Sequence, residues 1–227
     1  MVEDRQFIAA IPLFADLPPA ALDEVARVLH ERHYPKGATI FRQGDPGEAI
    51  YFLREGRVKV YRVAPDGQEQ IIAIWEPPAA FGLVVALDQR PYPATAEAVE
   101  PSVVWMMRIP DYRRLQQEHP HLQSRVLLEV ADRLRGAQDR IHSLATRDLR
   151  SRLAEFLLRQ ARERGRRTDQ GWEVDLSYTH EELGGLLGAS RETITRALAE
   201  LRRSRALEMV GNRLILNEER LRAWVED

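Results

Sequence analysis

Between residues 38 and 109, apolar and polar positions alternate in short runs separated by glycine- and proline-containing turns. Alternation with a period of two is typical of half-buried strands. The runs predict strands at 40–41, 50–53, 58–61, 71–75, 94–99 and 103–109, after short helical patterns at 7–11 and 22–29. Many short strands joined by tight turns indicate a small antiparallel barrel or sandwich.

From residue 111 to 144 the pattern changes to that of one long helix, with Pro120 near the start of its main part. Apolar residues then recur at alternating steps of three and four, at Leu127, Val130, Leu134, Ala137, Ile141 and Leu144. This a/d repeat predicts a dimer seam, because the flanking positions are charged, as a narrow two-helix interface requires. A helix that packs only on its own domain is the alternative.

The remaining residues predict a helix-turn-helix followed by a hairpin. Asp148 is the expected N-cap of a helix, residues 165–171 form a polar loop, and Val174 and Leu176 suggest a strand. Thr179 and Glu182 match a capping box at the start of the next helix, and Gly188 allows a sharp reversal. The terminal hairpin is predicted at 207–210 and 214–216, with its turn at 211–212.

Ser190 is the expected cap of a second helix in this motif. Its buried stripe is predicted to be Ile194, Ala197, Leu198 and Leu201, which leaves Arg191, Glu192, Thr195, Arg196 and Glu200 at the surface. Such a helix places its first turns in the major groove. Arginine there bonds guanine, and glutamate accepts from cytosine. A helical hairpin with solvated charges is the alternative.

Composition adds limits to this picture. The 227-residue chain has a formal net charge of −2, but residues 191–205 hold five arginines against two glutamates. The absence of cysteine excludes disulfides and cysteine-ligated iron–sulfur clusters. No apolar stretch approaches the ~20 residues that span a bilayer, and the first residues lack the features of a signal peptide. We therefore expect a cytoplasmic protein without a membrane segment.

Residues 185–196, Gly-Leu-Leu-Gly-Ala-Ser-Arg-Glu-Thr-Ile-Thr-Arg, resemble the recognition signature of the CRP/FNR family of transcription regulators. Segments 35–37, 40–44, 50–53 and 56–60 with Gly67 resemble the β-roll of that family, and 94–99 resembles the strand after its ligand loop. The resemblance implies an α+β homodimer that acts with RNA polymerase. Its parts would be a jelly-roll-like β-roll sensor domain (1–110), a dimerisation helix and hinge (111–147) and a winged helix-turn-helix (148–227).

The resemblance also implies how DNA is read. Arg191, Glu192 and Arg196 match residues that contact bases in the TGTGA-like half-sites of a palindrome, and Ser190 and Thr193 match phosphate-contacting positions. With two further threonines, the predicted DNA-binding set is Thr179, Ser190, Arg191, Glu192, Thr193, Thr195 and Arg196.

The expected effector site departs from the family pattern for cyclic AMP. Leu83 replaces a glutamate, Pro93–Ala94 replaces an arginine–serine pair, and Ala137–Gln138 replaces a threonine–serine pair. A buried phosphate without that arginine lacks its bidentate counter-charge, so cyclic AMP is not expected to bind through the usual contacts. The predicted pocket residues are Phe81, Gly82, Leu83, Val84, Pro93, Ala94, Ala137 and Gln138.

The loop from Phe81 to Ala98 also resembles nitric-oxide-responsive members of the family, which implies haem as a possible cofactor. The candidate ligands are His30 and His33, expected near the end of a helix, and His142 on the dimerisation helix. The alternatives are surface histidines near a helix C-terminus, another apolar or anionic ligand, or no ligand. The apolar run 83–86 favours an uncharged ligand or a closed, constitutively active pocket.

Two rival classes fit the sequence less well. A metal enzyme on a cupin-like barrel needs histidines clustered on strands, and no histidine occurs between His33 and His119. A cyclic-nucleotide-binding subunit of a kinase or channel would lack the helix-turn-helix. We therefore expect neither enzymatic activity nor a dedicated metal site.

Overall fold

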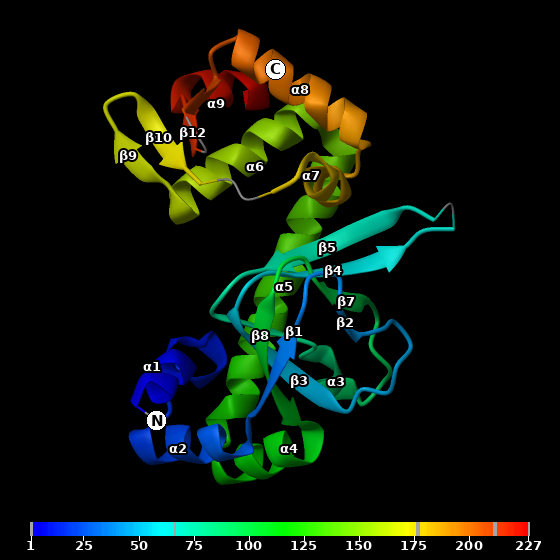
Figure 1. The fold of residues 1–227 in the computed structure, drawn as a ribbon, viewed down its shortest axis with the longest axis vertical. Helices are drawn as coiled ribbons and strands as arrows, with labels where there is room; N and C mark the ends of the chain where they lie inside the picture. Colours follow the sequence, from blue (N-terminus) through cyan, green and yellow to red (C-terminus); the bar gives the residue numbers. More distant parts are fainter. Residues whose placement is uncertain (1, 66, 176–177, 211–212, 227) are drawn as a thin grey trace. The chain divides into compact units, whose positions relative to one another are not determined.

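The computed structural model describes residues 2–65, 67–175, 178–210 and 213–226. They form two compact units, Met1–Gly136 and Ala137–Asp227, and the long helix α5 (His121–Thr146) contains the boundary between them (Figure 1). None of the helices within the described residues combines the length and apolarity needed to cross a membrane.

The first unit contains two four-stranded antiparallel sheets, as the alternating pattern predicts. One sheet has the order β1 (His30–Tyr34), β8 (Ser102–Arg108), β3 (Ala49–Glu55) and β6 (Ala79–Phe81). The other has the order β2 (Thr39–Phe41), β7 (Thr95–Ala98), β4 (Val58–Val63) and β5 (Glu69–Trp75). The short helix α3 (Val84–Asp88) follows β6.

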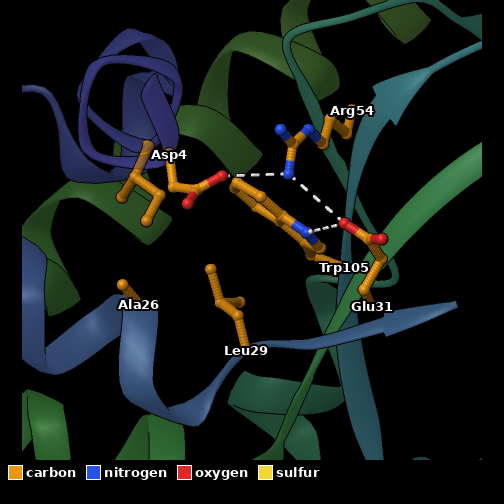
Figure 2. Close-up of a pocket in the computed structure, with 7 residues that line it drawn as sticks. Asp4, Ala26, Leu29, Glu31, Arg54 and Trp105 are labelled. Atoms are coloured by element: carbon orange, nitrogen blue, oxygen red, sulfur yellow. Dashed lines mark hydrogen bonds and ion pairs between the residues drawn. The ribbon is translucent and has the colours of Figure 1, made fainter. Parts of the chain in front are cut away.

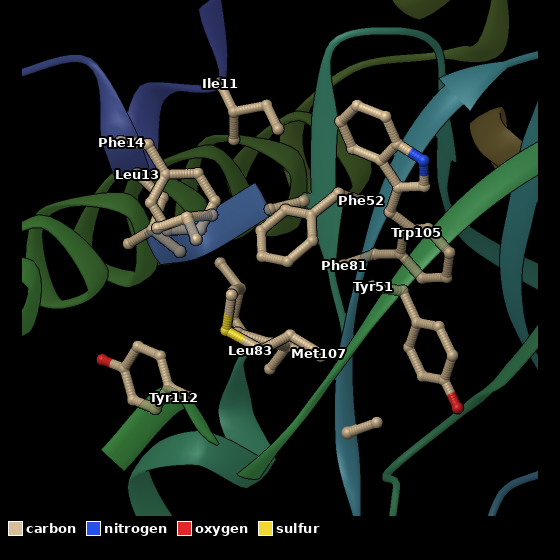
Figure 3. Packing of buried hydrophobic residues seen from close by; sticks show 14 of the residues in the cluster. Ile11, Leu13, Phe14, Tyr51, Phe52, Phe81, Leu83, Trp105, Met107 and Tyr112 are labelled. Carbon is tan, nitrogen blue, oxygen red and sulfur yellow. The ribbon is translucent and has the colours of Figure 1, made fainter. Parts of the chain in front are cut away.

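The N-terminal helices complete the core of this unit. They are α1 (Val2–Ala10), the 3-10 helix η1 (Pro12–Phe14) and α2 (Pro19–Val28). Figure 3 shows Phe14 of η1 beside Phe52 of β3, with Leu83 and Met107 in the same cluster. The centroids of the two phenylalanine rings are 5.1 Å apart. Burial of these apolar side chains is the main stabilising contribution to the unit.

The predicted single helix from 111 to 144 is wrong in one respect, because two helices occupy this region. Helix α4 (Ile109–Glu118) is followed by its C-cap His119, and α5 begins at His121. Pro120 separates them: it has no N–H to continue the hydrogen-bond ladder of α4, and its ring disfavours helical geometry at the preceding residue.

His30 follows the end of α2 closely, as predicted, but the sequence did not predict that His30 and His33 belong to a strand. Helix α2 ends at Val28, and both histidines lie on β1, an edge strand whose five residues pair with β8. The sequence of β1, His-Glu-Arg-His-Tyr, has no apolar alternation. Its strand state therefore depends on backbone pairing with β8, which a local pattern does not reveal.

The second unit combines four helices with one four-stranded antiparallel sheet in the described residues. The helices are α6 (Leu149–Arg164), α7 (His180–Leu187), α8 (Arg191–Arg203) and α9 (Glu218–Glu226). The sheet has the order β11 (Leu207–Val210), β12 (Arg213–Leu216), β10 (Gly171–Val174) and β9 (Arg166–Thr168). Leu153, Leu157, Ile194, Leu201 and Leu216 are buried between these elements.

Asp148 caps α6 as predicted, since its carboxylate accepts a 2.8 Å hydrogen bond from the Ser151 amide. The prediction of an irregular loop at 165–171 is wrong, because β9 lies within it and pairs with β10. The predicted strand residue Leu176 and the hairpin turn at 211–212 lie outside the described residues.

Candidate nucleic-acid interface and sensor core

The first helix of the helix-turn-helix begins at a complete capping box. The Thr179 hydroxyl accepts from the Glu182 amide at 3.1 Å, and the Glu182 carboxylate accepts from the Thr179 amide at 2.7 Å. These two bonds satisfy backbone donors that the first turn of α7 leaves unpaired. Thr179 therefore has a structural role, whether or not it also contacts DNA.

The turn between α7 and α8 depends on two glycines. Gly188 ends α7 with a φ of 67°, in the left-handed region that favours glycine. Gly184 lies where the turn packs on α7, and a Cβ there would stand 2.6 Å from the Ala189 carbonyl oxygen. Gly184 was not among the residues predicted from the sequence, although a glycine pair inside an amphipathic helix can indicate close backbone approach.

Ser190 caps the second helix, as predicted. Its hydroxyl accepts from the Thr193 amide at 3.3 Å and lies 2.9 Å from the Thr193 hydroxyl. The predicted buried stripe of α8 is confirmed, because Ile194, Ala197 and Leu201 are buried and Leu198 is partly buried. Packing of this stripe determines which face of α8 remains exposed and available for binding DNA.

The side chains expected at bases lie on the exposed face of α8. Arg191, Glu192 and Arg196 are all exposed, and so is Thr195 of the wider DNA-binding set. A hydrogen bond from its own backbone amide, and then one with the Ser190 hydroxyl, lower the pKa of Glu192. The carboxylate is thus ionised at neutral pH and can accept hydrogen bonds.

Thr195 links the two helices of the motif rather than pointing away from both. Its hydroxyl lies 2.8 Å from Nδ1 of His180 on α7 and donates to the Arg191 carbonyl at 2.9 Å. Arg196 donates to the Thr193 hydroxyl at 3.4 Å. Six of the seven predicted DNA-binding residues thus lie at the N-cap and first two turns of α8, whereas Thr179 lies at the N-cap of α7.

Two arginines that the sequence analysis did not assign to this site hold the C-terminal end of α7. Arg140 donates to the carbonyls of Gly185, at 3.3 Å, and Leu186. Arg152 of α6 donates to the Leu187 carbonyl at 3.1 Å. These carbonyls lack partners within the helix, and a cation is favoured near them. Burial lowers the pKa of Arg140, consistent with its inward position.

The apolar repeat of α5 is largely uncovered in the single chain. Leu134 is 59% exposed and Ile141 67%, while Leu127 and Leu144 are also exposed. Val130 differs, because it is partly buried against the core of the first unit. Leu128, outside the predicted repeat, is 54% exposed. An uncovered leucine-rich stripe of this length calls for a partner surface.

The predicted effector pocket falls in a region filled by aromatic rings. Phe41 and Tyr92 stack with centroids 3.9 Å apart, and Tyr51 stacks on Phe81 at 5.4 Å. The Tyr92 hydroxyl donates to the Ala49 carbonyl at 2.6 Å and accepts from its amide at 3.2 Å. Burial raises the pKa of both tyrosines, so their hydroxyls stay protonated. The polar atom of Tyr92 is therefore already satisfied.

The members of the predicted pocket differ in exposure. Phe81, Leu83 and Ala94 are buried, Gly82 is partly buried, and Val84, Pro93, Ala137 and Gln138 are exposed. Arg133 of α5 also reaches this region and was not predicted. It donates to the Ala80 carbonyl at 2.5 Å, and its guanidinium lies 4.4 Å from the Trp75 ring centre. Arg133 thus fastens α5 to the strand that enters the loop.

The three histidines considered as haem ligands do not fit that group. His30, His33 and His142 are all exposed, whereas a haem site requires an apolar shell around the iron ligand. Nε2 of His33 lies 3.1 Å from the Glu31 carboxylate. The positions of these imidazoles on β1 and α5 therefore favour ordinary surface roles.

A pocket of about 200 Å³ contains none of the predicted effector-pocket residues in its lining. Figure 2 shows Asp4, Ala26, Leu29, Glu31, Arg54 and Trp105 around it. Arg54 contacts Asp4 at 3.0 Å and Glu31 at 3.3 Å, and its guanidinium lies 4.7 Å from the Trp105 ring centre. The Trp105 indole N–H donates to Glu31 at 3.0 Å, which is the main reason that the pKa of Glu31 is lowered. These groups satisfy one another and tie α1 to the sheet.

Comparison with known proteins agrees with this arrangement. Residues 31–119 match the cyclic nucleotide-binding domain, and residues 151–224 match the Crp-like helix-turn-helix domain. The cyclic AMP receptor protein of Thermus thermophilus is 34% identical over 190 residues, which cover 84% of this chain and 85% of that protein. The chain belongs to the CRP/FNR family of transcription regulators.

Two further CRP/FNR relatives cover nearly the whole chain. The CRP-like cAMP-activated global transcriptional regulator of Mycobacterium tuberculosis is 29% identical over 95% of this chain and 97% of its own. The structure of FixK2 from Bradyrhizobium japonicum has a TM-score of 0.77 at 26% identity, covering 87% of this chain and 97% of that one. The α+β fold, the DNA-binding regulatory function and the family predicted from the sequence are thereby confirmed.

Proposed function

We propose that this CRP/FNR regulator acts as a homodimer joined along α5. The proposal is supported by the exposure of Leu127, Leu134, Ile141 and Leu144 on one helix, at heptad spacing. Two such helices would bury each other's stripe. A dimer would also present two copies of α8, which a palindromic site requires.

We propose that the exposed side chains on the first turns of α8 recognise DNA. Arg191 and Arg196 would bond guanine in the major groove, and Glu192 would accept from cytosine. Ser190 and Thr193, at the helix N-terminus, would contact phosphate. The proposed site is a palindromic duplex with TGTGA-like half-sites about 34 Å apart, bound in the cytoplasm together with RNA polymerase.

The aromatic interior supports a proposal about the effector. Leu83 is buried where a cyclic nucleotide would need a carboxylate, and the uncharged Pro93 stands at the position of the arginine. We therefore propose that the regulator either binds an uncharged ligand or needs no effector, and that cyclic AMP does not act through the family's usual contacts. The exposed positions of His30, His33 and His142 argue against haem.

Binding to a palindromic duplex with two TGTGA-like half-sites tests the DNA proposal, with a scrambled duplex as reference. We expect two chains per palindrome and markedly weaker binding to the scrambled duplex. Arg191→Ala should cost about 1–3 kcal/mol on the palindrome, which is the value of one bidentate base contact, and little on the scrambled duplex. Fluorescence anisotropy and sedimentation velocity provide the two readouts.

Arg162→Ala is the matched control, because Arg162 is exposed on α6 and lies outside the proposed interface. It should leave both affinities within about twofold, since it removes a similar charge without a base contact. Equal affinity for the two duplexes, or a bound species containing one chain, would contradict the proposal.

A further inference from the structure

The junction between α4 and α5 holds a cluster of metal-ligating side chains that the sequence does not reveal. The cluster consists of Glu24 of α2 and of Glu118 and His119 at the end of α4. Each residue offers one ligand atom, and these atoms all lie within 4.8 Å of one another. Nε2 of His119 lies 3.0 Å from the Glu24 carboxylate. We propose that this cluster is a binding site for a divalent transition metal, of which Zn²⁺ is the best match.

The next histidine along the chain, His121, is the proposed fourth ligand. The ring centroids of His119 and His121 are 6.2 Å apart, with an angle of 64° between the ring planes. Metal–imidazole bonds of about 2.0–2.1 Å place two rings on one ion with centroids roughly 5–6 Å apart. His121 is exposed and lies outside the three-residue cluster, so its side chain would have to turn toward the ion to bind it.

Backbone hydrogen bonds hold these ligands in place on both sides of Pro120. The His119 amide donates to the Leu115 carbonyl at 2.7 Å, and the His119 carbonyl accepts from the Leu122 amide at 3.0 Å. Helices α2 and α4 pack against each other within the first unit (Figure 1). Glu24 is thereby brought to a residue 95 positions away in the chain.

Charge and ligand type indicate which ion fits. Two carboxylates lie close together with one imidazole, and their mutual repulsion favours a cation between them. Mg²⁺ and Ca²⁺ prefer all-oxygen sites, whereas a mixed nitrogen and oxygen set suits Zn²⁺ and its neighbours. The His119 side chain is 19% exposed, which limits competition from water. A bound ion would clip α2 to the start of α5.

Zinc titration of the chelator-treated, untagged protein tests this site. We expect one Zn²⁺ per chain by isothermal titration, a higher melting temperature with Zn²⁺, and visible d–d absorption on Co²⁺ substitution. Mg²⁺ and Ca²⁺ should neither bind with one-to-one stoichiometry nor raise the melting temperature. His119→Ala should weaken Zn²⁺ binding at least tenfold, since loss of even an outer partner of a metal site costs roughly 10–100-fold.

Two other variants separate the metal site from a simple ion pair. Glu24→Gln keeps a hydrogen-bonding partner for His119 but removes a carboxylate ligand, so it should also weaken Zn²⁺ binding while circular dichroism shows a folded chain. His142→Ala removes an exposed histidine elsewhere on α5 and should leave binding unchanged. Absence of saturable one-to-one binding overturns the proposal, as does equal affinity in wild type, His119→Ala and Glu24→Gln.

Discussion

At the scale of single residues, the helix-turn-helix depends on positions where a side chain is either required or excluded. Thr179, Glu182 and Ser190 supply the caps that start α7 and α8. Gly184 excludes a side chain, because the Ala189 carbonyl approaches its α-carbon. The caps are recognisable as local motifs, whereas the close approach at Gly184 results from packing of the turn on α7.

Gly184→Ala should therefore destabilise the second unit by about 1–3 kcal/mol, the usual cost of overpacking. The added Cβ would stand 2.6 Å from a backbone oxygen, which cannot rotate away as a flexible side chain does. Thermal and urea denaturation, followed by circular dichroism, provide the measurement.

Gly136→Ala is the control for this substitution, since it is also a helical glycine but a Cβ there meets nothing within 4 Å. It should stabilise α5 by about 0.5–1 kcal/mol through helix propensity. Equal changes in the free energy of unfolding for the two substitutions would show that the close approach at Gly184 does not affect stability.

At the scale of elements, α5 has two kinds of contact along its length. Val130 and Arg133 hold it to the first unit, and Arg140 caps α7 in the second. Its leucine stripe stays uncovered. Helix α5 therefore contacts its own chain through some of its side chains and leaves the stripe exposed, which is the surface proposed above for dimerisation.

Leu134→Glu should abolish dimerisation without unfolding the chain, because Leu134 is 59% exposed in the protomer and a charge at a seam position is costly only when the seam is buried. Specific DNA affinity should fall together with dimerisation. Sedimentation velocity and anisotropy report the two effects.

Arg135→Glu is the matched control, because this neighbouring residue is exposed, lies outside the seam and pairs only at the surface with Asp132. Its exposed ion pair contributes little, so the variant should remain dimeric. A dimeric Leu134→Glu variant that binds DNA normally would rule out the proposed seam.

At the scale of the whole molecule, the chain combines a sensor-type unit with a DNA-binding unit. The family relation is common to both units, and aromatic side chains are packed in the interior of the first. Rings of Phe41, Tyr51, Phe81 and Tyr92 stack there, and Tyr92 hydrogen-bonds to the backbone. An anionic ligand would have to displace these contacts without the arginine that the family pattern has at the position of Pro93.

Cyclic AMP should consequently give no calorimetric binding tighter than about 1 mM, an affinity of roughly −4 kcal/mol. It should also leave the DNA affinity of the dimer unchanged, because a ligand without differential binding shifts no equilibrium. A micromolar dissociation constant, or cyclic-AMP-dependent DNA binding, would contradict this expectation. Cyclic GMP serves as the matched ligand control.

Most of this architecture was predictable from local sequence. Alternating runs predicted most strands of the β-roll, and the capping box, the cap at Ser190 and the stripe of Ile194, Ala197 and Leu201 predicted both helices of the motif. These features succeed because each depends on residues within a few positions of one another. The family resemblance implied base contacts for Arg191, Glu192 and Arg196, which the local sequence pattern alone does not assign.

The tertiary structure decided what depends on distant partners. Polar β1 is a strand because β8 pairs with it, Pro120 divides the predicted helix, and Arg140 and Arg152 cap α7 from other helices. Glu24 meets His119 only because α2 packs on α4. In each case the stabilising contact joins groups far apart in the chain, so neither spacing nor periodicity carries a signal of it.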